Sequence, residues 1–124
     1  MNSLQAVETT GRPCPGTKIP CYIFRSAEDA GRHVAQLVAN TIRERNSYGR
    51  YAVLGLATGS SPVSVYRELI RLHRDEGLDF SRVITFNLDE YYGLTPDRPQ
   101  SYHRWMHEHF FKYINIRPEN IHIP

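Results

Sequence analysis

The sequence of 124 residues predicts an α/β fold in which helices cover both faces of a parallel sheet. Short apolar runs suited to strands alternate with longer stretches that repeat apolar residues at helical spacing. Glycine, proline and polar residues separate these stretches, as they do at turns. Because strands that alternate with helices form parallel sheets, the expected order is β-α-β-α-β-α-β, a truncated Rossmann-like arrangement.

The chain is expected to divide into an N-terminal extension and one folded domain. Residues 1–18 contain glycine and proline with little periodicity. We expect them to be flexible or to pack on a segment that is not present in this sequence. The domain is expected to span 19–124 and to begin with a strand at 19–24.

A first helix is predicted from residue 27 to about residue 45. Ser26 suits the N-cap, since its hydroxyl can accept a hydrogen bond from a free backbone N–H, and acidic residues follow in the first turn. Apolar residues then share one face at helical spacing. They are Ala27, Ala30, Val34, Leu37, Val38 and Ile42.

The middle of the chain predicts two strands with a helix between them. The apolar run 51–56 suits a strand that is buried on both faces, and the run 83–88 suits the next strand. The helix between them begins at Pro62, whose missing N–H is not needed in a first turn. Gly77 suits its C-terminal end.

The last predicted helix follows Ser101, and residues 120–123 are expected to form a final strand. His103 and His107 lie four positions apart, so they share one face of this helix. No glutamate or aspartate joins them at ligand spacing, so we expect no metal site. The aromatic residues of this helix are expected in the core or at a subunit contact.

Composition and charge exclude several classes of protein. Apolar residues make up 40% and charged residues 23% of the chain, as in ordinary globular proteins. The net charge of +2 is small, and acidic residues interrupt the basic ones, so no nucleic-acid partner is expected. The apolar runs are too short to cross a membrane, and the N-terminus lacks the apolar segment of a secretory signal. We therefore expect a cytoplasmic protein.

The two cysteines are Cys14 and Cys21. Their spacing does not follow a metal-binding pattern. In a reducing cytoplasm we expect two free thiols, and a disulfide between them stays open as an alternative.

Residues 58–62 join a predicted strand to the following helix and have the features of an anion site. Gly59 lets the backbone bend and leaves room for a ligand. The helix that follows presents unpaired N–H groups and the positive end of its dipole, and the hydroxyls of Thr58, Ser60 and Ser61 add donors. The turn is therefore a candidate phosphate site, although an ordinary turn with a serine N-cap explains the same residues.

Asp89 and Glu90 follow the next predicted strand and stand at its carboxyl end. Carboxyl ends of parallel strands lie on the edge of the sheet where ligands bind, so these acids are expected to face the 58–62 turn. A carboxylate there suits a general base that acts on a phosphorylated small molecule. The alternative is structural, with one acid capping the next turn and the other pairing with an arginine. For Glu90 this structural alternative, a cap or an arginine pair, is favoured, and for Asp89 both interpretations stay open.

Three segments together resemble the glucosamine-6-phosphate deaminase family. They are residues 55–62, 85–94 and 101–107, with the sequences GLATGSSP, TFNLDEYYGL and SYHRWMH. The resemblance runs from about residue 19 to residue 124. The 6-phosphogluconolactonases of the wider superfamily share a turn of the first kind, whereas the second and third segments resemble the deaminase branch.

The resemblance implies a hydrolase and isomerase activity in which glucosamine 6-phosphate and water give fructose 6-phosphate and ammonia. The sugar ring opens, a proton moves from C2 to C1, and the amine leaves, without a metal or an organic cofactor. Asp89 matches the enolisation base of the family, and Tyr102 matches a tyrosine close to the substrate. Thr58, Gly59 and Ser60 match the loop that holds the phosphate of the substrate.

Members of this family are considerably longer than this chain. Their ring-opening residues, and the basic residues that clamp the phosphate, lie in the second half. The resemblance therefore implies that 19–124 is the N-terminal part of such an enzyme, which forms homo-oligomers when full length. Two alternatives stay open: a non-enzymatic module that binds sugar phosphates, and a hydrolase similar to 6-phosphogluconolactonases.

Overall fold

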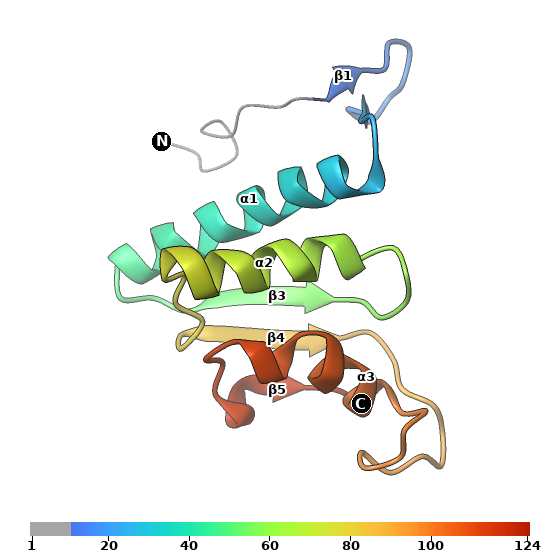
Figure 1. The fold of residues 1–124 in the computed structure, drawn as a ribbon, viewed down its shortest axis with the longest axis vertical. Coiled ribbons are helices and arrows are strands. Elements are labelled where there is room, and N and C mark those ends of the chain that lie inside the picture. The colour runs from blue at the N-terminus through green and yellow to red at the C-terminus, as the bar shows by residue number, and fades with distance from the viewer. Residues whose placement is uncertain (1–10) are drawn as a thin grey trace.

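A computed structural model describes residues 11–124, which form a small sheet with helices packed against it (Figure 1). The strands are β1 (Arg12–Pro13), β2 (Tyr22–Ile23), β3 (Ala52–Leu56), β4 (Val83–Asn87) and β5 (Ile121–His122). The helices are α1 (Ala27–Ser47), α2 (Val63–Glu76) and α3 (Tyr102–His109), and short 3-10 turns follow at Phe111–Tyr113 and Pro118–Asn120. None of the helices within residues 11–124 is long and apolar enough to cross a membrane.

Strands β3, β4 and β5 form a parallel sheet in that order, which confirms the predicted α/β class. Leu56 pairs with Asn87 where β3 and β4 end, and Phe86 pairs with His122 on β5. Because the strands run the same way, the β3–α2 turn and the loop after β4 leave the sheet at the same edge (Figure 1). That edge carries the residues of the candidate site.

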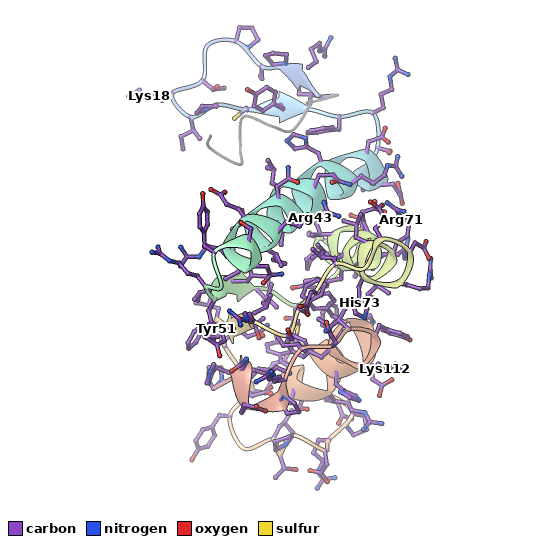
Figure 2. The ribbon with its side chains drawn as sticks, turned by 90° about the vertical axis from the view of Figure 1, so that its left-hand side faces the viewer. Lys18, Arg43, Tyr51, Arg71, His73 and Lys112 are labelled. Atoms are coloured by element: carbon purple, nitrogen blue, oxygen red, sulfur yellow. The ribbon has the colours of Figure 1, made fainter. Side chains whose placement is uncertain are left out.

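The helices pack against one face of this sheet. Ribbons of α2 and α3 lie on the same side of the sheet in both views, and α1 lies on α2 along the β3 edge (Figure 1, Figure 2). One hydrophobic cluster joins buried residues of all these elements. It includes Ala35, Ala39, Ile42, Ala52, Tyr66, Leu69, Leu72, Val83, Met106 and Phe110.

The opposite face of the sheet differs from the prediction in two details. Helices are expected there too, and the 51–56 run is expected to be buried on both faces. Consecutive strand residues point to opposite faces, so Ala52 is buried while Val53 is 61% exposed. Phe86 on β4 is 49% exposed on the same open face. Within residues 11–124 the sheet is therefore covered on one side.

The strand expected at 19–24 does not join the parallel sheet, so this part of the prediction is wrong. Instead β2 pairs antiparallel with β1, with Pro13 opposite Tyr22, in a hairpin beyond the N-terminal end of α1 (Figure 1). Tyr22 and Ile23 are 47% and 50% exposed, so this short strand is not part of the hydrophobic core. The hairpin crosses the expected boundary between extension and domain, and residues 1–10 lie outside the described residues.

The helix ends are those that the sequence predicts. Ser26 accepts a hydrogen bond from the Asp29 N–H at 3.1 Å, and Ser101 accepts one from the Arg104 N–H at 3.1 Å. Gly77 ends α2 with a φ of 70°, a left-handed conformation that suits glycine. These local signals decide where each helix begins and ends.

The buried face of α1 is not the predicted stripe, because Val34 is 41% exposed. The buried residues are small ones, Gly31, Ala35 and Ala39, together with Ile42. A Cβ at Gly31 would lie 2.9 Å from the backbone carbonyl carbon of Ser64 on α2. Glycine therefore allows α1 and α2 to approach closely, which apolar periodicity alone does not reveal.

Glu90 fastens the loop after β4 to the start of α3. Its side chain is 7% exposed, and its oxygens accept hydrogen bonds from the N–H groups of Tyr91 (2.8 Å), Tyr102 (2.8 Å) and His103 (3.0 Å). The ring Nδ1 of His103 lies 2.8 Å from the same carboxylate. Burial disfavours the charge, but these hydrogen bonds outweigh it and lower the pKa of Glu90 to about 2. The structural role favoured for Glu90 is confirmed, and it is that of a cap rather than of an arginine partner.

Gly31→Ala is expected to lower the free energy of unfolding by about 1–3 kcal/mol, the usual cost of a methyl group forced into a packed contact. At an exposed helical position the same change stabilises by up to about 1 kcal/mol, so the sign of the effect tests the contact. Urea denaturation measures it. Adding Ser64→Gly, which removes the side chain that the methyl meets, is expected to recover part of the loss. A stabilising Gly31→Ala would contradict the close approach of α1 and α2.

Glu90→Gln is expected to destabilise the fold by about 1–3 kcal/mol at pH 7, because the charged acceptor of several N–H groups is lost. The pKa of Glu90 is about 2 in the folded protein, below its ordinary value of 4.5. Its stabilisation is therefore complete above the unfolded pKa and disappears as the pH falls through the folded pKa. The difference in unfolding free energy between wild type and variant is therefore expected to shrink as the pH is lowered from 6 to 2. Most of this change is expected between about pH 4.5 and about pH 2.

The matched control is Glu119→Gln, which changes an exposed glutamate outside this network. Denaturation of both variants across the same pH series separates the local effect from a general effect of charge. A difference for Glu90→Gln that does not vary with pH would contradict the assigned cause.

Candidate active site

The turn between β3 and α2 is open to a ligand. Gly59 has a φ of 101°, and no described atom lies within 4 Å of the position that a Cβ would take. Ser60 and Ser61 are exposed, and Thr58 is partly exposed. Pro62 is the N-cap of α2, and none of the side chains in residues 11–124 caps its first turn, so the alternative of a serine N-cap is wrong. The Val63 N–H donates to the Ser60 carbonyl at 3.4 Å, so the N–H groups that follow it in the first turn are the uncapped ones, at the positive end of the helix dipole beside this turn.

Tyr66 of α2 anchors the beginning of the turn. The Ala57 N–H donates to the Tyr66 hydroxyl at 3.1 Å, and this hydroxyl donates to the Ala57 carbonyl. Burial raises the pKa of Tyr66 to about 12, against the opposing effect of the hydrogen bond to Ala57. The ring is 3% exposed and stacks on Phe110, with 4.8 Å between the centroids. The turn is thus attached to the hydrophobic core.

Asp89 lies two residues beyond the end of β4, at the same edge of the sheet as the turn. Its side chain is exposed to solvent. The adjacent Glu90 is occupied by its hydrogen bonds to the start of α3. The two neighbouring acids therefore have different surroundings, one structural and one open to solvent.

Tyr102, the first residue of α3, connects the turn with Asp89. A hydrogen bond with Tyr91, burial and the negative charge of Asp89 raise the pKa of the Tyr102 phenol. A hydrogen bond with Thr58 acts in the opposite direction. The rings of Tyr91 and Tyr102 lie 4.7 Å apart at a tilt of 41°. The structure thus brings Thr58, Asp89 and Tyr102 together from separate segments, and the rest of the predicted phosphate loop follows Thr58 directly.

Asn87 is a residue of this edge that the motifs do not single out. It is 8% exposed, and among the described residues neither its Oδ1 nor its Nδ2 has a hydrogen-bond partner. Together with His103 and His122 it lines an open hollow of about 380 Å³. Buried amides normally find partners, so this one is available to a ligand or to another part of the protein. The feature of the sequence that could have identified Asn87 is its polar amide near the end of a largely apolar strand.

Two histidines of α3, His103 and His109, contact other protein groups. His103 and His107 are the pair considered for metal binding. His103 faces Glu90. The ring of His109 stacks on Trp105 at 4.1 Å, and its Nδ1 lies 2.9 Å from the Trp105 carbonyl oxygen. Within residues 11–124, no group of three or more His, Cys, Asp and Glu side chains is placed to hold a metal ion.

Known proteins match the part of the chain that carries this edge. A sequence profile of the family described as glucosamine-6-phosphate isomerases/6-phosphogluconolactonase matches residues 25–124. Glucosamine-6-phosphate deaminase 2 of Giardia intestinalis is 54% identical over 100 residues, and glucosamine-6-phosphate deaminase 2 of Bacillus subtilis is 53% identical over 91 residues. These stretches cover 81% and 73% of this chain but 36% of each relative.

Solved structures show the same fold over most of the chain. A monomeric glucosamine-6-phosphate deaminase has a TM-score of 0.76 and 44% identity, covering 82% of this chain and 40% of that one. A 6-phosphogluconolactonase of Thermotoga maritima has a TM-score of 0.52 and 26% identity, covering 72% and 40%. This chain therefore spans well under half the length of these relatives. It belongs to the family of glucosamine-6-phosphate isomerases and 6-phosphogluconolactonases.

Proposed function

We propose that this chain supplies the phosphate-binding turn and the enolisation base of an enzyme that converts glucosamine 6-phosphate and water to fructose 6-phosphate and ammonia. The observation that carries the proposal is that Thr58, Tyr102 and Asp89, from three separate segments, lie near one another where β3 and β4 end. Relatives at 54% and 53% identity are named for this deaminase, whereas the lactonase structure is 26% identical. The deaminase is therefore favoured over the lactonase.

The 58–62 turn is proposed to hold the phosphate of the substrate. Gly59 leaves space for the anion, and the uncapped N–H groups in the first turn of α2 lie beside it with the positive end of the dipole. The hydroxyls of Thr58 and Ser60 add hydrogen-bond donors. Fixing the phosphate orients the carbon atoms of the sugar relative to Asp89, which lowers the entropic cost of the reaction.

Asp89 is proposed to carry a proton from C2 to C1 of the open-chain sugar. The hydrogen on C2 is acidic because it lies next to the C1 carbonyl, and a carboxylate is a suitable base for it. Asp89 takes this proton, the electrons move through an enediol-type species, and Asp89 returns the proton to C1. The resulting iminium at C2 is hydrolysed by water to the ketone and ammonia. Tyr102, whose phenol is affected by the negative charge of Asp89, is proposed to hydrogen-bond to a substrate oxygen.

The remaining parts of the active site are proposed to lie outside this chain, which covers 36–40% of the relatives described above. Ring opening and the basic clamp on the phosphate are assigned to those parts, so turnover belongs to the longer protein. The proposal includes no metal and no organic cofactor. The proposal keeps the cytoplasm as the location of the activity. Homo-oligomer formation is kept as a proposal for the longer protein, although the relative at 44% identity is described as monomeric.

Asp89→Asn is expected to reduce ammonia release by about 10²–10⁴-fold, the usual contribution of a general base, while binding of glucosamine 6-phosphate is retained. The assay uses the protein that contains this chain with any sequence encoded after Pro124. Asp97→Asn, in the same exposed loop, is the control and is expected to be active. Undiminished turnover of Asp89→Asn would remove Asp89 from the role of base. Lactone opening without ammonia release would favour the lactonase instead.

The isolated 124-residue chain is expected to bind glucosamine 6-phosphate weakly, with heat detectable at millimolar ligand, and not to bind glucosamine. Gly59→Ala is expected to weaken binding at least about tenfold, because a side chain at this φ costs about 1–3 kcal/mol. Gly16→Ala is the control, since Gly16 also has a positive φ with no described atom nearby but lies in the hairpin. Absence of heat in calorimetry would argue against a binding module that acts alone.

A further inference from the structure

Cys14 and Cys21 face each other across the hairpin formed by β1 and β2. The register pairs Arg12 with Ile23 and Pro13 with Tyr22, so the next pair is Cys14 with Cys21. The Cys14 N–H donates to the Cys21 carbonyl at 2.9 Å, which shows that the pairing continues to this position. Residues directly opposite each other in an antiparallel ladder have side chains on the same face. The two thiols are therefore on one face of the hairpin.

The backbone at this pair has the spacing that a disulfide needs. Because Cys14 and Cys21 are a hydrogen-bonded pair, their Cα atoms are expected about 5.5 Å apart. Disulfides form at Cα separations of about 4.4–6.8 Å, so the backbone spacing lies within this range. The Cβ atoms of opposite residues lie about 4.5–5.5 Å apart, so a small approach of the two strands brings them to the roughly 3.5–4.5 Å of a disulfide. Both cysteines are free in the described part of the chain.

The loop between the two cysteines is already closed in the reduced protein. The Thr17 hydroxyl reaches the carbonyl of Cys14 at 3.3 Å and that of Ile19 at 2.7 Å. Gly16 adopts a φ of 81°, which lets the loop turn back. Little conformational freedom is therefore lost when the two sulfurs join.

The pair is also accessible to a reagent in solution. Cys21 is exposed and Cys14 is partly exposed. Lys18 projects from the tip of the loop, away from α1 and α2 (Figure 2). The hairpin lies before residue 25, where the match to the family begins, so the proposed deaminase chemistry does not account for the pair.

We propose that Cys14 and Cys21 form a thiol–disulfide exchange site that accepts a small-molecule disulfide such as oxidised glutathione. The more exposed Cys21 thiolate attacks one sulfur of the oxidant, which releases one small thiol and leaves a mixed disulfide on Cys21. The Cys14 thiolate then attacks the Cys21 sulfur and expels the second small thiol. The two cysteines lose two electrons to the oxidant, and their protons end on the two released thiols.

The experiment incubates the chain in glutathione buffers of increasing oxidised fraction, followed by acid quenching, alkylation and mass spectrometry. The expected product is a monomer that has lost two hydrogens and takes up no alkylating agent. Cys14→Ser is expected to stop at the mixed disulfide on Cys21, because the resolving thiol is missing. The oxidised wild-type chain is expected to regain both alkylation sites when it is reduced again.

The matched control keeps two thiols but removes their alignment. In the double variant Cys14→Ser and Pro15→Cys, the first thiol moves one position along the chain, away from the place opposite Cys21. We expect this variant to need at least about tenfold more oxidising buffer for half-oxidation, a shift of about 30 mV in potential. Equal oxidation of the control, a persistent mixed disulfide in the wild type, or formation of disulfide-linked dimers would each overturn the proposal.

Discussion

The Glu90 carboxylate is the interaction on which the arrangement of the candidate site depends. Parallel strands bring the β3–α2 turn and the loop after β4 to one edge, but the sheet does not position residues beyond Asn87. Glu90 does this by accepting the backbone N–H groups at the start of α3, including that of Tyr102. It lies directly after Asp89, so one buried charge determines where both Asp89 and Tyr102 stand. A neutral side chain of the same shape accepts fewer of these hydrogen bonds.

Much of the fold could be predicted because its signals are local. A serine before a helix and a glycine after one act within a few residues, and Ser26, Ser101 and Gly77 are found where they were expected. The structural role favoured for Glu90 is also found, because it accepts the N–H groups at the start of α3. For Asp89 the sequence pattern leaves the choice between a structural role and that of a base open, since spacing alone does not distinguish them.

Other features depend on contacts between distant segments and could not be read from periodicity. Tyr22 and Ile23 look like a buried strand, but their partner is a two-residue strand in the extension rather than the parallel sheet. The face of α1 that packs on α2 is the one with Gly31, where the two helices approach closely. A pattern of apolar residues does not reveal such a close approach. Pairing of Glu90 with the His103 ring joins residues 13 positions apart, and the unpartnered amide of Asn87 is visible only once its surroundings are known.

The double hydrogen bond between Tyr66 and Ala57 couples the candidate anion-binding turn to the interior of the molecule. Tyr66 stacks on Phe110, which in turn meets Phe80 at 5.7 Å, so a chain of aromatic rings runs from the core to the turn. Most ligand-binding loops can loosen while the body of a protein stays folded. This turn is held by the same side chain that fills the core, so its order is expected to persist until the core itself melts. Substitutions deep in the aromatic cluster therefore act on ligand affinity as well as on stability.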